Sequence, residues 1–179
     1  GELLAGSCYQ DLSKEEQERV TYKSCMYIWM FSINDVVYYG RKWEELEQFL
    51  TMLDNDIPEK KIVFIHNLAF EFQYLSGYFK FENVLARKSR KVMTCEFVNF
   101  NIECRCSLMM SGVALEKLPK QYNLPVEKLV GNLDYSKIRT AITPLTEEEL
   151  AYCENDCLVV YEYILIELKT YENVNKIPV

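Results

Sequence analysis

Short apolar runs alternate with polar segments along the chain, and their spacing predicts both strands and helices. Residues 24–33 are rich in aromatic and β-branched side chains, and after the turn pair Asn34-Asp35 a second such run covers residues 36–39. Together they predict a β-hairpin. Apolar residues then recur every three or four positions over residues 43–53, which predicts an amphipathic helix. Residues 62–65 are wholly apolar, and we expect a central strand buried on both faces.

The middle of the chain continues this alternation with less regular patterns. Residues 68–78 are compatible with a helix, and two strands are expected at residues 94–98 and 102–108. Residues 114–122 predict a short helix that Pro119 interrupts.

The last helix has the clearest signal. Thr146 and Glu149 have the spacing of a capping box, and Pro144 stands just before them. The predicted apolar face consists of Leu150, Cys153, Cys157, Val160, Ile164 and Leu168. Strands concentrated early, with helices after the central strand and at the end, predict a single α/β domain over residues 1–179, in which helices flank a mixed sheet.

Composition narrows the class of protein. The 179 residues are 49% hydrophobic with only 6 Gly and 5 Pro, which excludes a disordered or fibrous chain. There is no apolar run long enough for a membrane span and no signal peptide, so we expect a soluble, cytoplasmic protein without a membrane partner. The 20 basic and 27 acidic residues give a net charge of −7, which argues against a module that holds duplex DNA by charge alone.

The cysteines do not predict a metal site. Seven are scattered along the chain, and the single histidine is His66. The two close pairs, Cys104 with Cys106 and Cys153 with Cys157, have no second pair at zinc-binding spacing. We therefore expect reduced thiols, largely buried, as in cytosolic proteins.

Two residues of the last helix are candidates for catalysis. Tyr152 and Asp156 are four positions apart, so both project from one side of the helix at the border of its apolar face. A carboxylate there can ligate a divalent metal, and the phenol can hold a water that attacks phosphorus. The alternative is a chance pair on a surface helix.

A second group of candidates follows the short apolar strand. The strand ends at His66-Asn67 and runs into a helix carrying Glu71, and ligand sites in α/β sheets lie at the carboxyl ends of strands. Asn67 either caps the helix or holds a nucleotide. Phe70 and Tyr74 either pack in the core or stack on bases. His66 is expected to order the strand end, and the less favoured alternative is that it acts as a base.

These motifs together resemble a known family. The segment His66-Asn-Leu-Ala-Phe-Glu71, followed later by Tyr152-x3-Asp156 on a capped helix, is similar to the second and third exonuclease motifs of DnaQ-like 3′→5′ exonucleases. The stretches 118–135 and 142–152 narrow the resemblance to the proofreading domain of protein-primed family B DNA polymerases from phages and linear plasmids.

The resemblance implies an RNase H-like fold and hydrolysis of a terminal phosphodiester with two Mg²⁺ or Mn²⁺ ions. Glu71 and Asp156 would be the metal ligands, and Tyr152 would orient the attacking water. The implied partner is the 3′ end of single-stranded DNA, in a bacterial host cytoplasm if the source is a phage. A polymerase domain of the same chain is a further implied partner if the chain is truncated. The residues expected to hold that 3′ end are Asn67, Phe70, Tyr74, Ser107, Leu108 and Tyr135.

The chain also departs from the family. The first motif, Asp-x-Glu, is missing from residues 3–7, the candidate for the opening strand, so two of the expected carboxylates are absent. Val130 stands where the family often has a lysine. Loss of essential ligands lowers activity by orders of magnitude. The alternatives are therefore a catalytically silent module that binds single-stranded nucleic acid or a protein partner, and, less favoured, a relative of oligoribonucleases.

Overall fold

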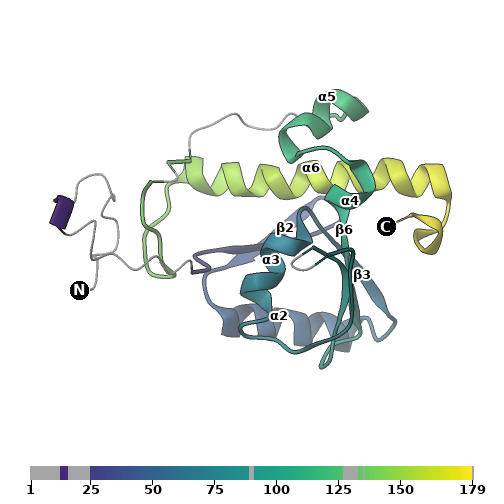
Figure 1. The fold of residues 1–179 in the computed structure, drawn as a ribbon, viewed down its shortest axis with the longest axis horizontal. Helices are drawn as coiled ribbons and strands as arrows, with labels where there is room; N and C mark the ends of the chain where they lie inside the picture. Colours follow the sequence, from purple (N-terminus) through teal and green to yellow (C-terminus); the bar gives the residue numbers. More distant parts are fainter. Residues whose placement is uncertain (1–12, 16–24, 89–90, 127–132, 135, 179) are drawn as a thin grey trace.

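A long helix and a four-stranded mixed sheet form the body of the molecule (Figure 1). The structure is a computed structural model that describes residues 13–15, 25–88, 91–126, 133–134 and 136–178. Its strands are β1 (Trp29–Ile33), β2 (Val36–Gly40), β3 (Lys61–Ile65), β4 (Phe81–Ala86), β5 (Val92–Phe97) and β6 (Ile102–Cys106). Its helices are α2 (Trp43–Asp56), α3 (Leu68–Leu75), α4 (Ser107–Ser111), α5 (Leu118–Tyr122) and α6 (Glu147–Tyr171), with 3₁₀ turns η2 (Leu115–Lys117) and η3 (Val174–Lys176).

The predicted hairpin and the helix after it are confirmed. Strands β1 and β2 pair antiparallel, and Asn34 in the turn adopts a left-handed conformation with φ of 54°. The last residue of β2, Gly40, has to be a glycine because a Cβ there would lie 2.5 Å from the Trp29 ring. The ring of Trp29 in turn contacts Phe49 of α2, with centroids 5.5 Å apart. The hairpin therefore lies between α2 and α6, as Figure 1 shows.

The sheet has the order β3-β6-β5-β4 and is mixed, as the sequence predicts. Strand β3 runs parallel to β6, while β5 runs antiparallel to both β6 and β4. Ile65 is opposite Cys106, and Thr94 is opposite Arg105. The carboxyl ends of β3 and β6 and the start of β5 therefore meet at one end of the sheet, which we call the carboxyl edge.

One prediction about the sheet is wrong. Within the described residues β3 is the outermost strand, and its five residues are half-buried instead of fully buried. Its apolar run reflects packing partners on its faces. Val63 and Ile65 contact a hydrophobic core that includes Leu50 and Cys95, and Phe64 packs against a separate one around Val159. A wholly apolar strand requires covered faces, and it need not be central.

Several boundaries also differ from the predictions. Strand β6 ends at Cys106, and Ser107 and Leu108 begin α4 instead of continuing the strand. Pro119 lies in the first turn of α5, so it starts a helix and does not interrupt one. Helix α3 ends at Leu75. Strand β4, which the sequence pattern does not predict, is the outermost described strand on the side of the sheet opposite β3.

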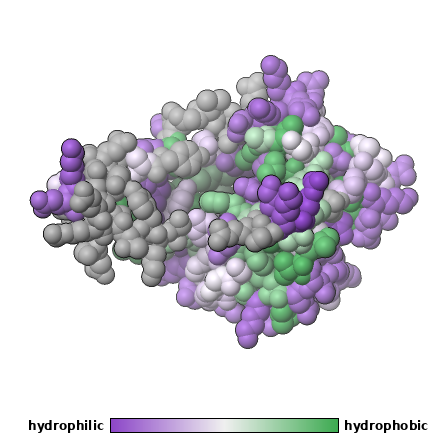
Figure 2. All heavy atoms as spheres, viewed as in Figure 1, coloured by the Kyte–Doolittle hydropathy of each residue, from purple (hydrophilic) through white to green (hydrophobic). Residues whose placement is uncertain are grey.

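Two hydrophobic cores are joined by the sheet and α6. The first lies among the hairpin, α2, α3 and the sheet, and its most buried members include Leu50, Leu68 and Cys95. The second lies between α5 and α6 around Val159 and Tyr163. Figure 2 shows patches of apolar surface in the middle of the molecule's face, interrupted by strongly hydrophilic residues, with more hydrophilic residues along the margins.

The start of α6 is fixed by a network of polar contacts. The Thr146 hydroxyl accepts a hydrogen bond from the Glu149 N–H, and the Glu149 carboxylate accepts one from the Thr146 N–H, which confirms the capping box. Arg139 donates from Nε to Glu149 Oε1 at 3.0 Å, and both side chains are buried. Arg41 at the end of the hairpin donates to the carbonyls of Thr140 and Thr143. These bonds attach α6 to the hairpin.

Six cysteines lie in the described residues, and all are free thiols, as predicted. Cys95, Cys104 and Cys106 are buried, while Cys25 is exposed. Among the residues that the structure describes, no helix combines the length and the apolarity needed to cross a bilayer.

Candidate active site

The candidate site begins where β3 and β6 end side by side. His66 follows β3 and Ser107 follows β6, and the His66 Nδ1 atom lies 3.1 Å from the Ser107 Oγ atom. Ser107 is 0% exposed. The hydrogen bond therefore orders the carboxyl edge, in agreement with the role expected for His66, and the Ser107 side chain faces His66 and not solvent.

Asn67 starts α3 in an unusual way. It has a left-handed backbone, with φ of 61° and ψ of 50°, and its carbonyl accepts a hydrogen bond from the Phe70 N–H at 2.8 Å. Its side chain makes no capping hydrogen bond, and the residue is exposed. Asparagine adopts the left-handed conformation more readily than most residues, because its side chain is short and can hydrogen-bond locally. The backbone carbonyl of Asn67 thus bonds the first turn of α3, and the residue itself is exposed to solvent.

Glu71 lies one turn further along α3. The residue is accessible to solvent, and the protein around its carboxyl group raises its pKa by desolvation. No positive side chain offsets this effect among the causes of the shift. A desolvated carboxylate without a neighbouring positive charge is stabilised in its ionised form when a cation binds to it.

Tyr152 and Asp156 lie on α6, one turn apart. Tyr152 is only 8% exposed, and the Asp156 Oδ1 atom is buried, so the pair lies on a buried face of the helix and not at the border of it. The same face continues with Val159 and Tyr163. The prediction of a bordering position is therefore wrong for Tyr152, which is buried, whereas Asp156 as a whole is half-buried. The reason is that α6 packs against the hairpin and β3 as well as against α5, so it is covered on more than one side.

The thiol of Cys157 is influenced by the charges of both Asp156 and Glu71. Burial raises the pKa of Cys157 to about 12, and the negative charges of Asp156 and Glu71 contribute to the same shift. Charge effects of this kind fall off within several ångströms. The charge of Glu71 on α3 thus reaches the thiol next to Asp156 on α6, although the two carboxylates are far apart in sequence.

Two aromatic rings lie beside Glu71 on α3. Phe70 is 50% exposed and Tyr74 is half-buried, and their centroids are 5.3 Å apart at an angle of 60°. The sequence leaves core packing and base stacking as alternatives for Phe70. A ring that is half exposed does not fit core packing. Leu108 is half-buried and contacts the first core. Tyr135, the remaining candidate contact, lies outside the described residues.

The described residues offer a limited set of metal ligands. No group of three or more His, Cys, Asp or Glu side chains capable of holding a metal occurs among them. One or two protein carboxylates, such as those of Glu71 and Asp156, are enough for a single Mg²⁺ or Mn²⁺ ion, because such ions complete their shell with water and phosphate oxygens. They do not by themselves provide for two ions.

The sequence analysis missed the residues that hold α6 in place. Arg139 and Arg41 join it to the rest of the molecule, and the Arg139 guanidinium also lies 5.9 Å from the centre of the Tyr27 ring. Tyr27 OH is 4.0 Å from Cys153 Sγ on α6. The available signal was an arginine just before a predicted helix with three consecutive acidic residues in its first turn.

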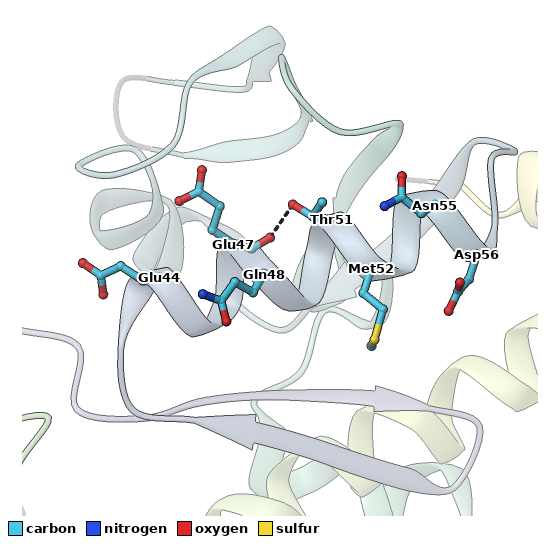
Figure 3. Close-up of a pocket in the computed structure, with 7 residues that line it drawn as sticks. All are labelled: Glu44, Glu47, Gln48, Thr51, Met52, Asn55 and Asp56. Carbon is cyan, nitrogen blue, oxygen red and sulfur yellow. Dashed lines mark hydrogen bonds between the residues drawn. The ribbon is translucent and has the colours of Figure 1, made fainter.

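An open hollow on the outer face of α2 lies apart from these residues (Figure 3). It is lined by Glu44, Glu47, Gln48, Thr51, Met52, Asn55 and Asp56, all of α2. None of its lining residues belongs to the candidate site.

Solved structures provide a comparison for the whole fold. The Phi29 DNA polymerase complexed with primer-template DNA and incoming nucleotide superposes with a TM-score of 0.62 and 20% identity, over 76% of this chain. The fold is similar to part of Phi29 DNA polymerase. The same polymerase complexed with single-stranded DNA gives a TM-score of 0.60 and 21% identity, over 75% of this chain. The matched region spans 26% of the Phi29 polymerase chain.

Sequence comparison adds no relative to this picture. No protein-family model matches the chain, and a search of curated proteins finds no significant match. At 20–21% identity, the similarity to the Phi29 polymerase establishes the arrangement of the sheet and helices.

Proposed function

We propose that the chain is a 3′→5′ exonuclease domain with an RNase H-like fold, of the kind found in phage-type family B DNA polymerases. The observation that carries the proposal is that the charges of Asp156 on α6 and of Glu71 on α3 both act on the thiol of Cys157. The similarity in fold to Phi29 DNA polymerase, which was solved with single-stranded DNA, supports it. The substrate is the unpaired 3′ end of a DNA strand.

Each candidate side chain has a task that its position allows. Glu71 and Asp156 hold a divalent ion, which when bound lowers the pKa of a water and neutralises charge on the phosphate. Tyr152 orients the attacking water from one helical turn away. The amide of Asn67 donates hydrogen bonds to the terminal nucleotide, and Phe70 and Tyr74 stack on unpaired bases.

The environment of Glu71 sets the pH dependence of this site. Desolvation raises its pKa, so in acidic solution a proton competes with the ion for the same oxygens. Activity should therefore increase with pH through the titration of Glu71 and then level off. A Glu71→Gln variant would lose activity at every pH.

The direct test is cleavage of a 5′-labelled single strand with Mn²⁺ or Mg²⁺, followed on a sequencing gel. We expect a ladder of shortened products from the wild-type chain and its loss in Asp156→Ala. Glu154→Ala is the matched control, because Glu154 is an exposed acid on the same helix. Absence of products from the wild type at micromolar protein with either metal would refute the proposal.

A second function is favoured by one observation. The described residues contain no cluster of three metal-ligating side chains, and this suits a domain that retains the fold without the chemistry. Such a module would bind single-stranded nucleic acid or a protein partner without turnover. Retention of a labelled strand by the wild type, with no cleavage after prolonged incubation in Mn²⁺, would support this function over the first.

A further inference from the structure

The turn between β4 and β5 carries a dense positive charge in an acidic protein. Four of the five residues 87–91 are basic, whereas the whole chain has a net charge of −7. Arg87, Lys88 and Lys91 are described by the structure, and all three are exposed. Arg90, the fourth, lies outside the described residues.

These three side chains differ from the lysines nearby. Lys60 pairs with Glu96 and Glu103, and Lys61 pairs with Asp54. Within the described part of the chain, neither Arg87, Lys88 nor Lys91 has a carboxylate at ion-pair distance. The turn is held by its backbone, since the Arg87 N–H donates to the Lys91 carbonyl at 3.2 Å. Its charges are therefore available to an external anion.

The register of the sheet places this turn at the carboxyl edge. Thr94 of β5 is opposite Arg105 of β6, so the start of β5 lies next to the end of β6. His66, which precedes α3, leaves the sheet at the same end, because Ile65 is opposite Cys106. The acidic members of the β4–β5 pair, Glu82 and Glu96, face each other toward the opposite end. Positive charge is thus concentrated on the side of the candidate site.

We propose that Arg87, Lys88 and Lys91 form a contact for the phosphate backbone of a nucleic acid strand whose end enters the candidate site. Exposed cations without carboxylate partners bind phosphates with release of counterions. The contact would also offset the repulsion between the acidic surface and the strand. The choice of nucleic acid as the anion rests on the proposed function, while the location of the contact rests on charge and register alone.

The test is the salt dependence of binding of a fluorescent oligothymidylate, measured by anisotropy in EDTA so that no cleavage occurs. The triple variant Arg87→Ala/Lys88→Ala/Lys91→Ala should bind at least about tenfold more weakly at low salt. Its slope of log K against log salt should fall by up to about 2, because each phosphate contact to a single strand contributes about 0.7.

The matched control removes three charges elsewhere, as Lys80→Ala/Lys169→Ala/Lys176→Ala, all at exposed positions. It should retain the wild-type slope. Equal slopes for the two triple variants would overturn the inference, as would failure of the wild type to bind the strand. If the Arg87→Ala/Lys88→Ala/Lys91→Ala variant loses binding to polyglutamate while its binding to DNA stays intact, the turn would be a contact for an acidic protein. This result would also overturn the inference.

The same proteins separate this inference from the proposed function. A wild type that binds through the turn but does not cleave in Mn²⁺ upholds the contact and refutes the exonuclease. Cleavage that depends on Asp156, with equal slopes for both triple variants, upholds the exonuclease and refutes the contact. Thermal melting of each variant shows that a loss of binding is not a loss of folding.

Discussion

At the scale of single residues, the proposed function requires Glu71 and Asp156 to lie close together, although 85 positions separate them in the sequence. Neither carboxylate is unusual by itself, and a Tyr–Asp pair four residues apart is common on helices. Cys157 connects them, because its pKa responds to both charges as well as to burial. The thiol thus acts as a natural probe of the site.

The reactivity of Cys157 tests this arrangement. Burial is the largest cause of its raised pKa, followed by Asp156, with Glu71 contributing last. Asp156→Asn should therefore lower the pKa and speed alkylation by iodoacetamide at pH 9–10, and Glu71→Gln should do so to a smaller extent. Peptide mapping by mass spectrometry measures the rate. If Glu71→Gln leaves the rate unchanged, Glu71 does not act on this thiol.

The raised pKa of Glu71 also affects stability. Because the folded state binds this proton more tightly than the unfolded state, the stabilisation is fully present below the unfolded pKa and is lost as pH rises through the folded value. Glu71→Gln mimics the protonated form. It should melt at a higher temperature than the wild type at pH 7, with a difference that disappears near pH 4. A difference independent of pH would contradict the assignment.

At the scale of elements, the sequence predicted those with strong local patterns. The hairpin, α2 and the capped α6 have regular spacing or specific end signals, and the structure confirms them. Strand β4 was missed because residues 82–86 are all exposed and show no alternation of apolar positions. The end of β6 was misplaced because the alternation of apolar and polar residues continues through Leu108 into α4, and no breaker separates the two elements.

The candidate site was predictable only in part for a related reason. Motif spacing gives His66, Asn67, Glu71, Tyr152 and Asp156 as candidates, and the charges of Glu71 and Asp156 both act on Cys157. The buried arginine network before α6 could not be foreseen. Arg139 is satisfied by Glu149 and by the carbonyls of Asp134 and Lys137, and such backbone acceptors leave no pattern in a sequence.

The Arg139–Glu149 pair should contribute strongly to the position of α6. Their side chains are 5% and 9% exposed, so removing one partner leaves a buried charge. Desolvation alone would raise the pKa of Glu149, but the Thr146 N–H and Arg139 outweigh it and lower the pKa. Arg139→Met should therefore cost about 3–5 kcal/mol in urea unfolding at pH 7. Thr146→Ala, which removes only a cap, should cost about 1 kcal/mol. Equal losses would contradict this ranking.

At the scale of the whole molecule, α6 belongs to both halves of the structure. It contacts the hairpin and β3 on one side and α5 on the other, while the first core surrounds α2 and the sheet. A helix shared in this way couples the two cores. The candidate site depends on this coupling, because Glu71 lies on α3, which packs on the first core, and Asp156 lies on the shared helix α6.

Unfolding should therefore be a single transition. Both tryptophans, Trp29 and Trp43, pack against the first core, whereas Val159 lies in the second. Val159→Ala should lower stability by roughly 1–3 kcal/mol and shift tryptophan fluorescence and far-UV circular dichroism together. Separate transitions for the two signals would show that the cores unfold independently.

The measurement that tests the central claim most directly is digestion of one DNA strand labelled at either end, in the presence of Mn²⁺. The account predicts that the 3′-labelled strand releases a labelled mononucleotide from the earliest time, while the 5′-labelled strand shortens gradually. Asp156→Ala should abolish both signals. Internal fragments, early release of the 5′ label, or an intact strand with the wild-type protein would contradict the assignment of a 3′→5′ exonuclease.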